Sequence, residues 1–167
     1  MKTRGLVLVI CAIVAASPMP TAAWGLDVHR RIMMPVRYYV SDRDVPGVSA
    51  TQLATVAQTS FGSWSKVAGV SISAELLGMT SAVPFVDDKL SVIGFRARPD
   101  LDRTLGATTF GFDNVTGELI EADIFLNSAF DWSIAASGQS GRFDLQSTLT
   151  HGFDGRRHQV SGARAGI

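Results

Sequence analysis

Apolar residues recur at two different spacings along the chain, and the spacing predicts where helices and strands lie. From Ser49 to about Ala68 they recur every three or four residues, which predicts a long helix. Ser49 is a typical N-cap for this helix, and Gly69 is a typical stop. We expect the two aromatic residues of this helix to pack in the core. Its apolar positions are Leu53, Val56, Ala57, Phe61 and Trp64.

Short runs rich in β-branched and aromatic residues predict the strands. The turn residues from Asp113 to Gly117 join the runs at 108–112 and 118–127 into a hairpin. A loop around Gly78 follows the run at 70–76. Asp144 is a plausible cap for a second helix that begins there. This order predicts an α/β (α+β) sandwich with a mixed, twisted sheet. The predicted strands are residues 36–40, 70–76, 90–95, 108–112 and 118–127.

The N-terminal segment has the pattern of a signal peptide. Lys2 and Arg4 precede an apolar run from Gly5 to Ala16, and small residues at 21–23 predict cleavage after Ala23. The apolar run is shorter than the ~20 residues that a membrane-spanning helix needs. We therefore expect a secreted protein, extracellular or periplasmic, without a membrane anchor after cleavage. Residues 1–23 are the predicted leader, and residues 24–34 form a short lead-in to the domain.

Composition limits the remaining possibilities. The 167 residues suit one domain, and 46% hydrophobic against 18% charged residues indicates a globular chain. The formal net charge is zero, so nothing favours nucleic acid as a partner. The one cysteine, Cys11, lies inside the predicted leader, and the secreted chain would then contain no disulfide.

A series of segments in a fixed order resembles the catalytic domain of bacterial matrixin-type metallopeptidases, which belong to the metzincins. The resemblance covers about residues 35–151 and implies a zincin-like sandwich with a long N-terminal helix and an active-site helix. It also implies a zinc cofactor and a peptide or protein substrate. The segments that carry it are residues 35–40, the helix ending near Trp64, and residues 118–127, 130–133 and 143–147.

In this family the helix after Asp-Leu-Gln-Ser carries the pattern H-E-x-x-H-x-x-G-x-x-H. Histidines four residues apart project from one helix face and can bind one zinc ion, and the glutamate acts as the general base. Here His151 stands at the first ligand position, but Gly152 replaces the glutamate. Gly155 and Ser161 stand at the other two ligand positions. His158 lies two helical turns after His151, which is not a family position.

The missing residues predict a domain without meaningful peptidase activity, because a catalytic zinc site needs about three protein ligands and a base. Residues 35–151 are expected to form an incomplete matrixin-like domain, and residues 152–167 a tail unrelated to the family. A truncation or frameshift would explain the abrupt change after His151. Three interpretations stay open: a peptidase relative, a non-catalytic secreted peptide-binding module, or a remnant without function.

Two further features follow from the resemblance. A matrixin edge strand lines the cleft and pairs with the substrate, and the return strand resembles that element, although it is equally well an ordinary sheet strand. Its residues are Leu119, Ile120, Glu121, Ala122, Asp123, Ile124 and Phe125. Family members also often bind structural calcium, for which carboxylates are suitable ligands. The spacing of the candidate carboxylates matches no known calcium-binding loop, so the default interpretation is that they are surface residues. The candidates are Asp87, Asp88, Asp100, Asp102 and Asp113.

Overall fold

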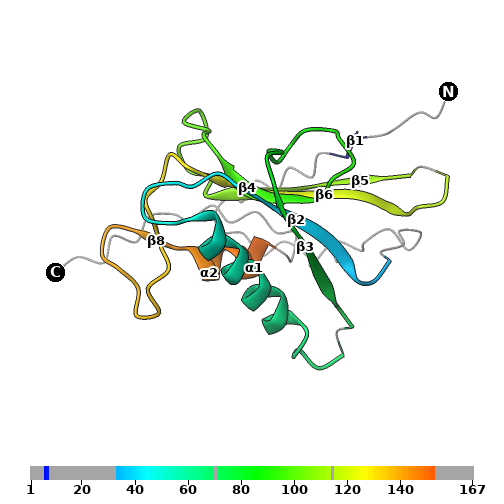
Figure 1. Cartoon of the computed structure of the whole chain (residues 1–167), viewed down its shortest axis with the longest axis horizontal. Coiled ribbons are helices and arrows are strands. Elements are labelled where there is room, and N and C mark those ends of the chain that lie inside the picture. The colour runs from blue at the N-terminus through cyan, green and yellow to red at the C-terminus, as the bar shows by residue number, and fades with distance from the viewer. Residues whose placement is uncertain (1–5, 8–32, 70, 114, 153–167) are drawn as a thin grey trace, which may run out of the picture.

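The computed structural model describes residues 6–7, 33–69, 71–113 and 115–152, and these form one mixed sheet with two helices against one face (Figure 1). Two of the sequence predictions fall outside the described residues. One is the cleavage site after Ala23, and the other is His158. The elements are β1 (Leu6–Val7), β2 (Val36–Ser41), α1 (Ala50–Trp64), β3 (Ala74–Thr80), β4 (Val92–Arg96), β5 (Gly106–Phe112), β6 (Leu119–Asn127), β7 (Trp132–Ser133), β8 (Phe143–Asp144) and α2 (Leu145–Gly152).

The main sheet has the strand order β1-β5-β6-β4-β2-β3. Strands β3, β2, β4 and β6 run parallel to one another, whereas β5 runs antiparallel to β6. β7 and β8 form a separate two-residue ladder. Four consecutive residues of β4, Val92 to Phe95, are buried because protein covers both faces of the sheet at its centre. The expected α/β class with a mixed sheet and two helices is confirmed.

The core lies between the sheet and the two helices. Ser49 caps α1 as predicted, in a capping box with Gln52 that satisfies two backbone N–H groups. Alternate residues of the strands and one stripe of each helix meet there. The largest contributors are Tyr38, Val40, Leu53, Ile93, Phe95, Leu126, Trp132, Leu145 and Leu149.

Two predicted boundaries were wrong. α1 ends at Trp64 instead of near Ala68, so Trp64 is only half-buried at the rim of the core, while Phe61 packs against Tyr38. The second long strand lies at 74–80 instead of 70–76, and the expected loop residue Gly78 is inside it. Parallel pairing with β2 decides this, since Val36 pairs with Ala74 and a bulge then shifts the register at Gly78, whose φ of 142° suits glycine.

The face of the sheet opposite the helices is covered by the loop at 81–91. Phe85 of this loop contacts Phe125 of β6 edge to face, with ring centroids 4.7 Å apart. Arg96 donates hydrogen bonds to the carbonyl oxygens of Pro84 and Phe85. Gly94 has to be glycine, because an added Cβ would stand 2.7 Å from the Cβ of Ser41. The loop therefore lies directly on the sheet.

Candidate functional site

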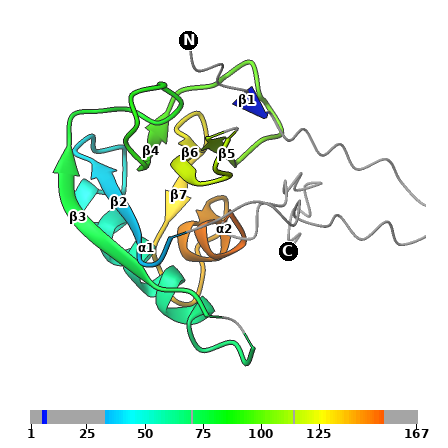
Figure 2. The same cartoon turned by 90° about the vertical axis from the view of Figure 1, so that its right-hand side faces the viewer.

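The second helix, which carries the family's first zinc-ligand position, is attached to the rest of the domain at several points. The Asp144 carboxylate accepts a hydrogen bond of 2.6 Å from the N–H of Ser147, as expected of an N-cap. Leu145 and Leu149 are fully buried in the core. Thr150 bonds to the Ser60 hydroxyl of α1. Figure 2 shows α2 on the same side of the sheet as α1, and α2 also contacts β5.

His151 lies in the last turn of α2 and is exposed. Its Nδ1 is 2.7 Å from the carbonyl oxygen of Ser147. A carbonyl oxygen can only accept, so Nδ1 carries the hydrogen and the lone pair of the neutral ring lies on Nε2. Metal-binding histidines commonly have this arrangement, because the hydrogen bond orients the ring. His151 therefore presents Nε2, which is one of the two ring nitrogens through which histidine can bind a metal ion.

The other ligands that zinc needs are not found beside it. Among the described residues there is no group of three or more His, Cys, Asp or Glu side chains that could hold a metal ion. Gly152 stands at the base position and ends α2. Gly155 and Ser161 offer no imidazole at the other ligand positions, and they lie outside the described part of the chain. The described residues therefore do not fit a catalytic zinc site.

The prediction that residues 119–125 form an edge strand was wrong. These residues belong to β6, which pairs with β4 on one side and with β5 on the other. β5 instead lies between β6 and β1, and β1 is the strand at this margin of the described sheet. The outer side of β5 pairs with β1, through Leu6 opposite Gly111 and Val7 opposite Phe110. The sequence did not separate the two strands of the hairpin, because which one lies inside depends on long-range pairing with β4.

Two carboxylates of β6 support the covering loop. Asp123, 1% exposed, accepts hydrogen bonds from the N–H groups of Phe85 and Val92. Glu121 accepts one of 2.6 Å from the N–H of Lys89. Burial raises the pKa of both side chains, and the hydrogen bonds offset part of that rise. For Glu121, repulsion from Asp123, Asp88 and Asp87 raises the pKa further. These carboxylates therefore hold the loop in place on the sheet.

The five candidate calcium ligands do not come together. Asp87 and Asp88 lie in the loop between β3 and β4, Asp100 and Asp102 in the loop between β4 and β5, and Asp113 at the hairpin turn. Asp88 and Asp113 accept hydrogen bonds from N–H groups two or three residues further on, which is the usual local role of aspartate in turns. Asp100 pairs with Arg98 at the surface.

Sequence reasoning missed Asn127 and Trp132 as organising residues. Trp132 is 1% exposed and donates its indole N–H to the carbonyl oxygen of Asn127. The Asn127 side chain is fully buried and bonds to the loop between β4 and β5. Asn127 follows five residues whose side chains alternate between the two faces of a strand. A polar residue at the end of such a strand was the signal in the sequence that could have identified it.

Comparison of the chain with protein-family models, with curated proteins and with solved structures finds no match. Within the described part of the chain, no helix is long and apolar enough to cross a membrane.

Proposed function

We propose that this chain is a relative of the secreted matrixin-type zinc endopeptidases that binds extended peptides along the outer side of β5 and does not hydrolyse them. The peptide would add a strand to the sheet through backbone hydrogen bonds. The runner-up is a remnant without function, which predicts no peptide binding.

The arrangement of β5 is the observation that carries this proposal. β5 is bonded on its inner side to β6 along its whole length, from Gly106 to Phe112. Its outer side pairs in antiparallel orientation with a two-residue extended segment of the same chain, which supports strand addition on this side. That segment, Leu6–Val7, belongs to the predicted signal peptide. Cleavage after Ala23 would remove it and leave this side of β5 for another extended peptide.

The surroundings of His151 support the absence of hydrolysis. The resemblance implies that α2 presents zinc to a peptide held at the sheet edge, and α2 does contact β5 here. His151 is the single family ligand retained, and Gly152 cannot take a proton from water. General acid–base assistance alone is worth ~10²–10⁴-fold in rate, and loss of the metal removes the activated water as well.

The test uses the chain as a secretory host releases it. Fluorescent peptides of mixed sequence, including fragments of casein, are titrated in anisotropy measurements, and mass spectrometry follows the same peptides for cleavage. Backbone amide exchange then locates the binding site. Binding without cleavage, with added protection at residues 106–112, supports the proposal. Cleavage that a chelator abolishes would show an active metallopeptidase, and no binding to any peptide would leave the remnant interpretation.

A further inference from the structure

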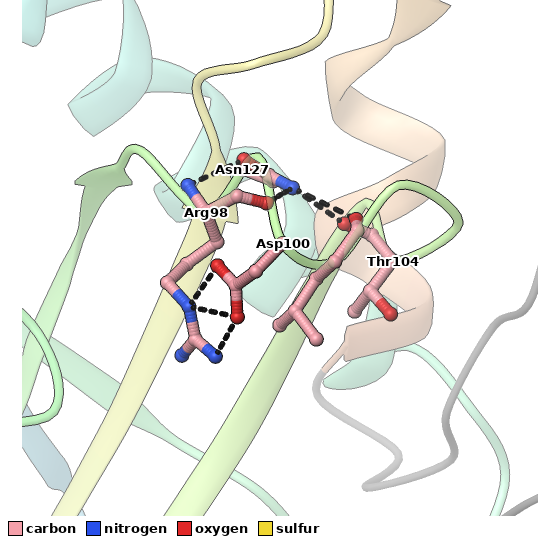
Figure 3. A network of polar contacts seen from close by, with 5 residues as sticks. Arg98, Asp100, Thr104 and Asn127 are labelled. Atoms are coloured by element: carbon pink, nitrogen blue, oxygen red, sulfur yellow. Dashed lines mark hydrogen bonds and ion pairs between the residues drawn. The ribbon is translucent and has the colours of Figure 1, made fainter.

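The side chain of Asn127 joins the end of β6 to the loop between β4 and β5 (Figure 3). Its Nδ2 donates to the carbonyl oxygens of Arg98 at 2.8 Å, Leu101 at 3.2 Å and Thr104 at 3.1 Å. Its Oδ1 accepts from the N–H groups of Arg98 at 3.0 Å and Ala129 at 3.1 Å. Because three carbonyls can only accept, the network itself assigns the amide orientation.

The loop's own bonds are few and short in range. The N–H of Leu101 donates to the carbonyl of Arg98, and the N–H of Thr104 to that of Leu101. Arg98 and Asp100 form an ion pair with side chains 33% and 61% exposed, which contributes little to stability in water. The carbonyls of these turns are the ones that Asn127 contacts. A single buried carboxamide therefore ties successive turns of the loop to the sheet.

The loop leads directly into β5. Leu105 is buried in the core, and its carbonyl accepts a hydrogen bond of 2.7 Å from the N–H of Asn127. Gly106 follows, and an added Cβ there would stand 2.6 Å from the carbonyl oxygen of Phe125. The start of β5 thus passes so close to β6 that there is no room for a side chain at position 106.

We propose that Asn127 is a positioning residue for the peptide-binding side of β5. Its carboxamide sets the path of residues 98–105, and that path sets where the β5 backbone stands relative to the sheet. Asn127 itself bonds to the loop and not to the bound peptide. This inference rests on the proposed function for its peptide-binding measurement, whereas the ordering of the loop is measured without any peptide.

The decisive variant is Asn127→Asp, which keeps the shape of the side chain and replaces its donor by an acceptor. At neutral pH the new carboxylate opposes three carbonyl oxygens. We expect amide exchange in residues 98–109 to accelerate about tenfold or more, and peptide affinity to fall by about tenfold. Exchange in α1 should stay at the parental rate. Burial and the facing carbonyl oxygens raise the pKa of the carboxyl in N127D, so a lower pH favours its protonated form, which donates again, and part of the lost affinity should return.

Two further variants complete the experiment. Asp100→Asn changes the charge of the same loop at its exposed ion pair and should leave both exchange and affinity as in the parent. Asn127→Ala removes the donor without a charge and should weaken binding equally at both pH values. This variant also replaces N127D if that one fails to fold. The charged residues of the loop that bonds to Asn127 are the same in both Asn127 variants; they are Arg98, Asp100, Asp102 and Arg103.

Each outcome decides a separate point. Faster loop exchange with unchanged peptide affinity would overturn the positioning role, and so would unchanged exchange in both Asn127 variants. A loss of peptide affinity in N127D that does not recover at the lower pH would also count against the positioning role, because a general structural defect would not be reversed by protonation. If the parent binds no peptide, the proposed function fails, and the positioning role fails with it, whatever the exchange of the loop shows.

Discussion

The indole N–H of Trp64 donates a hydrogen bond of 2.7 Å to the carbonyl oxygen of Thr150. The bond joins the last residue of α1 to the residue before His151, across 86 positions of sequence. The helix that carries the family's first ligand position is therefore held by a contact at the rim of the core, in addition to the burial of Leu145 and Leu149.

Replacing Trp64 by phenylalanine should remove this hydrogen bond and keep most of the ring. We expect the free energy of unfolding to fall by about 1 kcal/mol, which is the usual net value of one such bond. Urea unfolding followed by circular dichroism measures it. The matched variant Trp132→Phe, at a fully buried indole that donates to Asn127, should cost more because it also leaves a cavity. An equal cost for the two variants would contradict this account.

Two glycine substitutions should have opposite signs. At Gly94 an added methyl group would stand 2.7 Å from the Cβ of Ser41 and 3.1 Å from the Cδ of Pro84, so Gly94→Ala should destabilise by about 1–3 kcal/mol. At Gly62, in α1, nothing lies within 4 Å of an added Cβ, and Gly62→Ala should stabilise by about 0.5–1 kcal/mol. Thermal unfolding of both variants checks the pair, and a shift of Tm in one direction for both would refute it.

Asp123→Asn should weaken the attachment of the covering loop. Asp123 accepts hydrogen bonds from two N–H groups, and in D123N the amide NH2 would face one of these donors. We expect the free energy of unfolding to fall by about 2 kcal/mol at neutral pH. Because burial raises the folded pKa of Asp123 above the unfolded value, protonation of its side chain contributes stability that is fully present below about pH 4. That contribution is lost as the pH rises through the folded pKa.

The difference in unfolding free energy between the parent and D123N should therefore be larger below about pH 4 than at neutral pH. Urea titrations at several pH values give this difference directly. The opposite trend would mean that the hydrogen bonds to the carboxylate outweigh its burial and that its pKa is lowered in the folded protein.

Zinc should have little effect on the folded chain. A ligand that binds only the native state stabilises it by an amount that grows with the logarithm of the ratio of its concentration to Kd, and Tm rises accordingly. Because the described residues place no group of three or more His, Cys, Asp or Glu side chains together, we expect micromolar zinc or a chelator to change Tm by less than about 2 °C. Differential scanning fluorimetry measures this, with His151→Ala as the control. A larger shift that H151A abolishes would reveal ligands beyond those of the family motif.

The sequence by itself determined the local elements and what His151 lacks. Ser49 and Asp144 were recognisable as helix caps, because a cap acts on N–H groups two or three residues away. The hairpin from β5 to β6 was likewise predicted by its turn residues. The sequence also placed Gly152 after His151, and a glycine there has no side chain that could take a proton.

Only the tertiary structure decided which strand stands at the margin of the sheet. β6 pairs in parallel with β4, a partner about 30 residues earlier in the chain, and this pairing leaves β5 on the other side of β6, next to β1. The position of β3 followed from its register with β2. Asn127 and Trp132 gained their roles in the same way, since a buried carboxamide is useful only where separate backbone segments converge on it. Such convergence depends on distances between segments far apart in sequence, which no local pattern of residues encodes.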